Sequence, residues 1–592
     1  MLVALGVNSN SVYEIEFEEA FLRNTANFYI AESAEYIGQN TCADFLRKAS
    51  ERIREENERQ VAYLAQSTAP KLRRLMETHF IADHVMALME MDSGAIALMD
   101  EQKTDDLRLM YDLFRMVMTS VSWEAQVPER PDPRSVDAGT GATVSYRVER
   151  RKDPPLAILR HMMQWHIEST GYSIVQDTEQ SKDPVRFVER LLGLQAQYAT
   201  IIGSAFDQDR NFLWAMKSAF ESFMNVGPRC AQFLAMYLDM QMRSGFKSDS
   251  IEEIRSKLDA VVVAFRYVED KDVFENFYKQ YLQRRLLSGR SVSDEAEQLM
   301  IVRLKTECGT MFTSRLEGMF NDLRVSKEVM QAFRKQMEPA LEGPELSVTV
   351  LTTVNWQGSG ESSGRIPNAL RPSVEQFERW YLERFNGRIL QWQLMHGTAD
   401  LKMMYLPRSY ELVVTTYQMM ILLLFEEKDC DAATFAEIRE ETGIEEAELK
   451  RQLISLTTPA ARVLLKQHKS RQVGETEEFR LNYEYRSPKL KNRVRLVTMK
   501  SAKASEEEVT RSTAVPEHVE AARKNMIDAA IVRIMKARRT LEHSQLIAET
   551  HRLLQTRFHP QPADIKRRIE SLIERDYLER GEENNRVYQY VA

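Results

Sequence analysis

One lysine near the C-terminus has surroundings that suit an acceptor for a covalent modifier. The apolar residues before it recur with helical spacing, and at about 100° per residue they form one buried stripe: Ile527, Ile531, Ile534 and Met535. Lys536 lies about 140° from Ile531 on the same wheel, so its amine reaches water. An exposed amine on a rigid helix could form an isopeptide bond. The plainer interpretation is a solvated basic helix face, because Arg533, Arg538 and Arg539 flank the lysine.

Other arrangements that could support chemistry are missing from the sequence. It contains no Gly-x-Ser-x-Gly, no Gly-x-x-x-x-Gly-Lys and no His-Glu-x-x-His. His161 and His166 are five residues apart, which places them on different faces of a helix. Cys308 has no histidine near it in sequence and is better explained as a small buried residue. We therefore expect a non-catalytic protein without a metal or cofactor of its own.

Composition is that of a soluble globular protein. The 592 residues are 43% hydrophobic and 28% charged, with a net charge of -8 that does not favour general nucleic-acid binding. Four cysteines in so long a chain indicate free thiols in a reducing compartment. The start of the chain lacks the features of a signal peptide, and no run approaches twenty apolar residues. We expect a cytoplasmic and nuclear protein with no membrane contact.

The pattern along the chain predicts long helices first and mixed structure later. Val12–Phe246 is helical throughout, which is typical of stacked helical repeats, and the aromatic residues Phe17, Phe21 and Phe28 share a face of its first helix. Further predicted helices are Cys42–Gln66, Lys71–Met89, Lys103–Met118 and Arg186–Phe206. Four more helices follow between Ile251 and Gln336. After Pro344 the pattern predicts an α/β subdomain, with strands at Leu346–Leu351 and Arg388–Trp392.

The C-terminal third predicts two winged helices, each with three helices and a hairpin. The first spans Thr415 to about Val494, and the second spans His518–Ala592. Lys500–Val515 is polar, ends before Pro516 and is predicted to be a linker. Residues 126–155 are rich in proline and glycine and predict a surface loop or small hairpin, to which we assign no function.

Several motifs resemble those of the cullins, the scaffolds of ubiquitin ligases, and cover nearly the whole chain. Ile531–Lys536 and Tyr588–Ala592 resemble the C-terminal cullin signature. The opening and continuation of the cullin homology domain are matched by Asp270–Leu287, Leu304–Gly309 and Phe312–Asp322. Near the start, the cullin-3 subfamily in particular is resembled by Leu5–Asn8, Val12–Glu14 and Phe21–Tyr29.

The resemblance implies a mainly α fold with an elongated array of cullin repeats and a C-terminal globular region. Its expected parts are two repeats (1–125 and 126–250, the latter with the insertion 126–155), a four-helix bundle (251–340), an α/β subdomain (341–414), winged helix A (415–498), a linker (499–517) and winged helix B, the neddylation domain (518–592). The first of the three usual repeats has no counterpart here. Since that repeat docks BTB adaptors in the cullin-3 type, we expect no adaptor binding.

The resemblance also implies partners and sites. The chain would hold a RING-box protein, whose zinc-bearing RING recruits a ubiquitin-charged conjugating enzyme. Lys536 would carry a ubiquitin-like modifier, attached by an isopeptide bond, and a cullin-exchange factor and a deneddylating complex would act on the assembly. RING-box contacts are expected at a sheet edge with two tryptophans near it: Leu346, Val348, Val350, Leu351, Trp356 and Trp392.

Two alternatives remain open at this stage. Leu346–Leu351 could be an internal strand of a small sheet, and the tryptophans could be plain core. The family often has Trp-Pro where this chain has Trp356-Gln357, and the loop from Tyr405 to Tyr410 is short. The winged helices could bind nucleic acid, but the predicted third helix of the last module, Ala563–Tyr577, mixes acids with its bases, and concentrated positive charge is what phosphate binding needs. We therefore favour protein contact.

Overall fold

The computed structural model describes most of the chain, namely residues 11–117, 125–128, 148–151, 155–177, 183–337, 344–356, 363–427, 431–468, 473–497, 515–581 and 586–591. It divides into two compact units. Unit 1 comprises Met1–Phe277 and Thr513–Ala592, and unit 2 comprises Tyr278–Ser512. In the described ranges, no helix has both the length and the hydropathy needed to cross a bilayer. All of the predicted linker Lys500–Val515 except Val515, and most of the loop Gly358–Gly364, lie outside the described residues.

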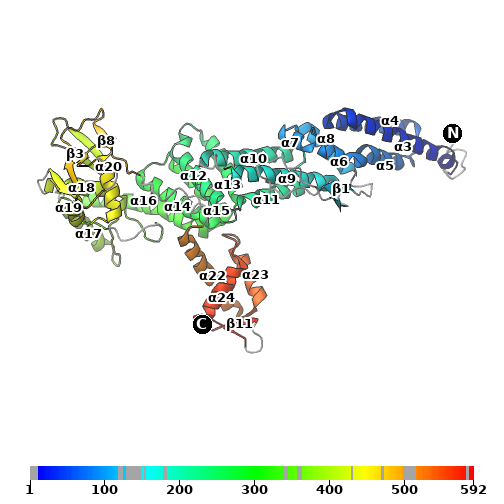
Figure 1. Ribbon diagram of the computed structural model, residues 1–592. Helices are drawn as coiled ribbons and strands as arrows, with labels where there is room; N and C mark the ends of the chain where they lie inside the picture. The colour runs from blue at the N-terminus through cyan, green and yellow to red at the C-terminus, as the bar shows by residue number, and fades with distance from the viewer. Residues whose placement is uncertain are drawn as a thin grey trace. The chain divides into compact units, whose positions relative to one another are not determined.

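Unit 1 begins with helices that pack side by side (Figure 1), as the repeat pattern predicted. Their bounds are α2 Ser11–Tyr13, α3 Glu19–Gln39, α4 Cys42–Tyr63, α5 Ala69–Met76, α6 Val85–Glu90, α7 Ala95–Asp100 and α8 Thr104–Val117, with a π turn at Glu14–Glu18. The start of α4 is capped by Thr41, whose side chain accepts a hydrogen bond from the Asp44 amide.

The single helix predicted at Lys71–Met89 is wrong. After α5 the chain passes through a π turn, Glu77–Ile81, and a 3₁₀ turn, Ala82–His84, before α6. The adjacent side chains Phe80 and Ile81 are both 1% exposed. The wider π turn changes the direction in which successive side chains point, so tertiary packing replaces the regular helical repeat here.

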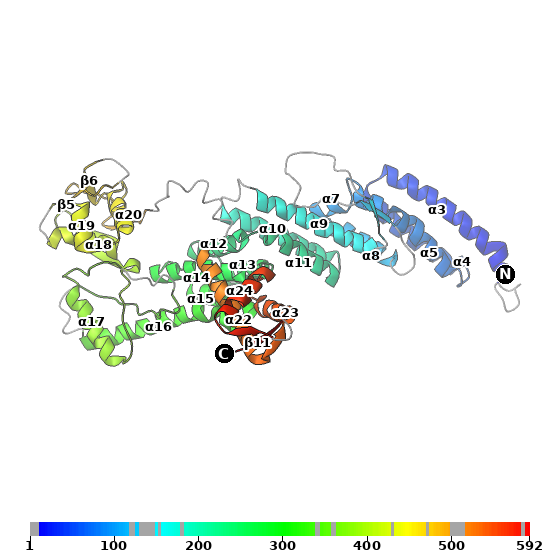
Figure 2. The same ribbon diagram turned by 60° about the horizontal axis from the view of Figure 1, so that its bottom comes forward.

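The second helical group of unit 1 is α9 Pro155–Gln176, α10 Pro184–Ser204, α11 Arg210–Met224, α12 Arg229–Arg243 and α13 Ile251–Arg266. Figure 2 shows α9, α10 and α11 alongside one another. Gly171 allows the close approach of α9 and α11, because a Cβ at that position would lie only 2.3 Å from the ring of Phe223. Of the region 126–155, the described residues include an antiparallel pair of short strands, β1 Ala125–Pro128 and β2 Val148–Arg151.

The C-terminal part of unit 1 is a winged helix, as predicted. Its order is α22 Glu517–Arg538, β9 Thr540–Glu542, α23 His543–Leu554, α24 Pro562–Glu574, β10 Leu578–Arg580 and β11 Val587–Tyr590. The strands form one antiparallel sheet in the order β10-β11-β9. Three helices enclose one core, to which α22 contributes Ile527, Ile531, Ile534 and Met535.

Helix α14, Lys271–Ser288, contains the boundary between the units, and unit 2 continues with α15 Asp294–Cys308, α16 Thr310–Met337 and α17 Arg371–Arg384. Winged helix A follows, with α18 Thr416–Glu427, β5 Ala432–Thr434, α19 Phe435–Thr442, α20 Glu446–Thr457, β6 Leu464–Lys466 and β7 Glu478–Leu481. Its strands pair antiparallel in the order β5-β7-β6. These elements match the helices and strands predicted for this module.

The prediction that Leu346–Leu351 and Arg388–Trp392 are strands of the α/β subdomain is wrong for the described sheet. The described sheet is formed by β3 Thr398–Met403, β4 Tyr410–Thr415 and β8 Lys491–Arg493, and β8 runs parallel to β4. Leu346–Leu351 and Arg388–Trp392 belong to no ladder in the described part of the chain. Side-chain burial alternates along Leu346–Val350, as in an extended chain, but none of the described strands pairs with this segment.

Candidate functional site: an exposed lysine and an unpaired extended segment

Lys536 lies in the last turn of α22 with its side chain exposed. Its neighbours Ile534 and Met535 are buried, at 8% and 0% exposure, so the helix cannot rotate to hide the lysine without exposing its core. In the described residues, no hydrogen bond or ion pair engages the Lys536 amine. The structure therefore places this amine in solvent, as the helical wheel predicted.

The end of α22 is fixed immediately after Lys536 by the last strand. Arg539 terminates the helix with φ 67°, a conformation that few side chains adopt. The Tyr590 amide donates to the Arg539 carbonyl at 2.9 Å, and the Arg539 guanidinium lies 5.7 Å from the centre of the Tyr590 ring. The terminal strand thus holds the helix end that presents the lysine.

A second anchor orients α22 on α24. The Asp528 carboxylate accepts hydrogen bonds from Arg568 and Arg575, each at 2.7 Å. Burial alone would raise the pKa of Asp528, but the hydrogen bonds from the two guanidinium groups outweigh burial and hold that pKa below its usual value. These two arginines therefore share one carboxylate inside the module.

The start of α22 is attached to the start of α14 within unit 1. The guanidinium of Arg523 contacts Asp270 at 2.9 Å and Asp272 at 2.5 Å, and it lies 4.8 Å from the centre of the Phe558 ring. His518 contacts the Asn276 side chain at 3.0 Å. Burial raises the pKa of Asp270, although the nearby Arg523 opposes that rise. Ionic and aromatic contacts therefore join the lysine-bearing helix to α14.

The segment before α17 forms the second candidate site. Leu346, Val348 and Val350 are half-buried and pack against an aromatic cluster on α16 and α17. The rings in this cluster are close, with centroids 5.1 Å apart for Phe333 and Phe377 and 5.3 Å apart for Phe333 and Trp380. Trp392 and Leu390 of the second extended segment pack on the same cluster. The structure therefore brings four predicted contact residues together: Leu346, Val348, Val350 and Trp392.

The other two predicted contact residues lie elsewhere. Leu351 is half-buried outside the aromatic cluster. Trp356 is 5% exposed, and its indole N–H donates to Asp322 at 2.9 Å. Sequence reasoning missed Asp322, which also accepts from the Thr352 amide, the Thr352 hydroxyl and the Asn355 side chain. The available signal was an acid at the end of the Phe312–Asp322 motif, close to the buried face of its helix.

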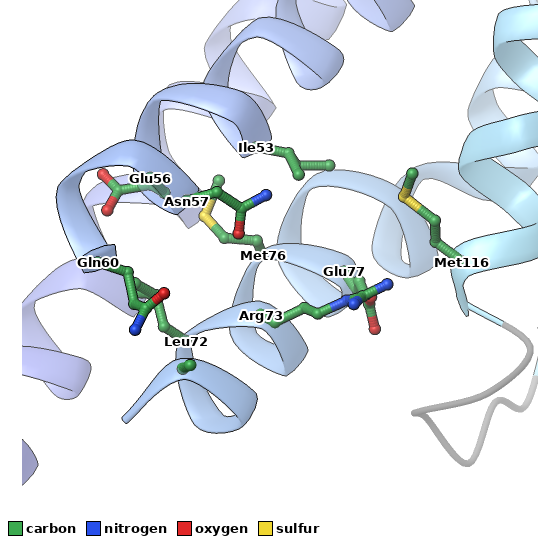
Figure 3. Close-up of a pocket in the computed structure, with 10 residues that line it drawn as sticks. Ile53, Glu56, Asn57, Gln60, Leu72, Arg73, Met76, Glu77 and Met116 are labelled. Carbon is green, nitrogen blue, oxygen red and sulfur yellow. The ribbon is translucent and has the colours of Figure 1, made fainter. Parts of the chain in front are cut away.

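One small cavity lies away from both sites, between α4, α5 and α8 (Figure 3). Its volume is about 130 Å³, and the side chains of Glu56, Arg73 and Glu77 line it. The charges already have partners, because Arg73 contacts Glu77 at 2.8 Å and Arg59 contacts Glu56 at 2.6 Å. We assign no ligand to this cavity.

Family models match most of the chain. The model described as "Cullin alpha solenoid domain" matches residues 1–126 and 143–330, "Cullin alpha+beta domain" matches 350–485, and "Cullin protein neddylation domain" matches 522–584. The first match is interrupted within the segment predicted to be an insertion. Lys536 lies inside the third match, and Asp322 lies inside the first.

Curated relatives match over nearly the whole chain. Cullin-3 of Dictyostelium discoideum is 35% identical over 629 residues, covering 100% of this chain and 76% of the relative. Cullin-3A of Arabidopsis thaliana is 38% identical over 585 residues, covering 98% and 74%. Cullin-4A of Homo sapiens is 35% identical over 592 residues, covering 99% and 71%.

Proposed function

The chain belongs to the cullin family, and on that premise we propose that it is the non-catalytic scaffold subunit of a RING-type ubiquitin ligase. Its helical array would set a distance, and its C-terminal parts would hold the RING-box protein and the acceptor lysine. Zinc would belong to the RING of the partner protein. The complex would act in the cytoplasm and nucleus.

Catalysis by such a scaffold is a matter of proximity. The RING-box protein would recruit the charged conjugating enzyme, and holding the ubiquitin thioester beside an acceptor amine replaces a bimolecular encounter with an effectively unimolecular one. This task requires stiffness and spacing from the scaffold. The closely packed α9–α11 pair around Gly171 is suited to it.

The observation that carries RING-box binding is the unpaired segment Leu346–Leu351. Its apolar side chains are held on an aromatic cluster, while no described strand pairs with its backbone. An extended strand of a partner could add there, because main-chain hydrogen bonds supply affinity in strand addition with little demand on side chains.

Lys536 would be the acceptor for the ubiquitin-like modifier. Its unprotonated Nζ would attack the thioester carbonyl of the charged modifier, so that the isopeptide C–N bond forms and the thiol of the carrier enzyme leaves. The exposure of Lys536 and the fixed end of α22 support this assignment. A cullin-exchange factor and a deneddylating complex are further expected partners of the same region.

Nucleic-acid binding is the alternative function, and charge pairing disfavours it. Several bases of the last winged helix have acidic partners within the module, which reduces the positive charge available to phosphates: Arg568 and Arg575 share Asp528, Arg580 contacts Glu570 at 2.6 Å, and Arg567 contacts Asp564 at 3.0 Å. Phosphate binding needs uncompensated positive charge.

Co-expression of the full chain with a RING-box protein tests the proposal. We expect a stable complex of one copy of each on size exclusion, which accelerates the discharge of ubiquitin from a charged conjugating enzyme onto lysine. A chain that forms no such complex, but binds duplex DNA with a steep salt dependence, would favour the alternative.

A further inference from the structure

One row of residues along α16 contacts the segment 344–356 at successive positions. The row, called here the α16 ridge, has a spacing of four and consists of Gly318, Asp322, Ser326, Met330 and Arg334. Residues four apart are neighbours on a helix surface, and a row of them winds gradually around the axis, so the ridge is a continuous, inclined line. Its members contact the segment in reverse order, which means that the segment runs antiparallel to α16.

The N-terminal part of the α16 ridge, Gly318 and Asp322, contacts the turn at the end of the segment. Asp322 is 9% exposed and accepts hydrogen bonds from Thr352, Asn355 and Trp356 at 2.9 to 3.2 Å. Gly318 leaves room for the Asn355 side chain, since a Cβ there would lie 2.5 Å from the Asn355 amide nitrogen. A buried carboxylate without these donors would be costly, so the turn is strongly tied to α16.

The C-terminal part of the α16 ridge, Ser326 to Arg334, contacts the earlier residues of the segment. The Ser326 hydroxyl donates to the Val350 carbonyl at 2.6 Å, and the Val348 amide donates to the Met330 sulfur at 3.5 Å. Arg334 contacts the Glu345 side chain at 2.7 Å. As the ridge advances towards the end of α16, the contacted residues therefore move back towards the start of the segment.

These contacts define the two edges of the segment. In an extended chain the N–H and C=O of one residue point to one edge, and those of the next residue point to the opposite edge. Val348 and Val350 direct theirs towards α16. The backbone groups of Ser347, Thr349 and Leu351 consequently point away from α16, and within the described residues none of them has a hydrogen-bond partner.

We propose that Asp322 and Ser326 are positioning residues that fix the segment in the one register which leaves the edge of Ser347, Thr349 and Leu351 open to a partner strand. The inference rests on the proposed binding of a RING-box strand and adds its register. The inward side chains, Leu346, Val348 and Val350, pack on the aromatic cluster. A strand laid beside them therefore needs apolar residues at alternate positions on that face and tolerates polar residues on the other.

Residue-resolved hydrogen exchange of the full chain, alone and with a co-purified RING-box protein, tests the register. On complex formation the amides of Ser347, Thr349 and Leu351 gain protection of at least about tenfold, because each becomes hydrogen-bonded. The exchange of the Val348 amide changes little. Protection of Val348 with none at its three neighbours would overturn the register while leaving RING-box binding intact. Failure to form a complex would instead refute the proposed function.

A pair of proline variants tests the open edge independently. Thr349→Pro removes an amide that bonds only to the partner strand, so RING-box affinity falls by about tenfold to a hundredfold while thermal stability of the free chain is retained. Thr353→Pro is the matched control, because Thr353 occupies the second position of a turn closed by the Asn355 amide and the Thr352 carbonyl at 2.9 Å, where proline is favoured. Equal affinities for the two variants would contradict the proposal.

Asp322→Asn tests the positioning role. The amide of asparagine presents a donor to the Asn355 and Trp356 donors, so the turn is released without a change in side-chain size. We expect RING-box affinity to fall by roughly tenfold, with the protection pattern spreading from the odd-numbered amides onto Val348. Ser326→Ala, which keeps the turn, should give a smaller loss in the same pattern. Weaker affinity with an unchanged protection pattern would show that Asp322 contributes to stability alone.

Discussion

The Arg523 guanidinium on α22 donates two hydrogen bonds, 2.5 and 2.7 Å long, to the Asp272 carboxylate at the start of α14. The two residues are 251 positions apart in sequence. Asp272 is nearly buried and Arg523 mostly so, with side-chain exposures of 7% and 17%. This pair is therefore a main contact by which the helix that carries Lys536 is attached to the rest of unit 1.

Arg523→Ala should loosen the C-terminal winged helix. It leaves Asp272 buried without its guanidinium, and losing one partner of a largely buried pair costs about 2–4 kcal/mol. We expect faster hydrogen exchange in α22 and α24 and earlier proteolytic release of this module. Arg533→Ala is the control, because Arg533 is exposed on the same helix and makes no ion pair in the described residues. Equal exchange rates in both variants would contradict the attachment role.

The C-terminal winged helix should lose stability in acid because of Asp528. Its pKa is held below the usual value, so the stability it contributes is present above the ordinary carboxyl pKa of about 3.9 and is lost as the pH falls through the lower folded-state value. Thermal unfolding between about pH 5 and pH 2 measures this loss. Asp528→Asn should flatten the pH profile, whereas Asp564→Asn, at the exposed pair with Arg567, should not. Identical pH profiles for the wild type and Asp528→Asn would contradict this stabilising role of Asp528.

Unit 2 contains a completely buried ion pair whose disruption should be costly. Arg285 and Glu297 are both 0% exposed and are joined at 2.6 and 2.9 Å. Glu297 also accepts from the Ser291 hydroxyl at 2.9 Å. Glu297→Ala leaves the guanidinium without its counter-charge, and we expect a loss of about 3–5 kcal/mol in denaturant unfolding of unit 2.

An exposed pair in the same unit provides the comparison. Arg324 and Glu328, at 67% and 62% exposure, are 2.9 Å apart on α16. Glu328→Ala should change the unfolding free energy by no more than about 0.5 kcal/mol, since solvent screens exposed pairs. A similar effect of the two substitutions would show that the buried pair is unimportant.

Local periodicity was sufficient to predict the helical array, both winged helices and the exposure of Lys536. The apolar stripe of α22 repeats every three to four residues, and the structure buries Ile527, Ile531, Ile534 and Met535 as predicted. Such features depend on neighbours within a few positions along the chain. The π turn at Glu77–Ile81 was missed because it depends on packing between helices, which local periodicity does not reveal.

The segment Leu346–Leu351 could be predicted only in part, for a different physical reason. Leu346–Val350 has the alternation of a strand, but pairing requires a partner, and none is found in the described chain. The hairpin of β3 and β4 was missed although its sequence alternates. Asp322 and its donors are 30 to 34 positions apart, so no local pattern reveals their contact.

The scaffold role is tested most directly by mapping the modifier on this chain. The full chain, co-purified with a RING-box protein, is incubated with the charged ubiquitin-like modifier and its enzymes, and the product is digested and analysed by mass spectrometry. We expect one isopeptide-linked peptide, centred on Lys536. Lys536→Arg keeps the charge but cannot form the bond, so it should abolish the modified product. Lys524→Arg, an exposed position on the same helix, should leave the product unchanged. A modified band that persists in Lys536→Arg would contradict the acceptor assignment.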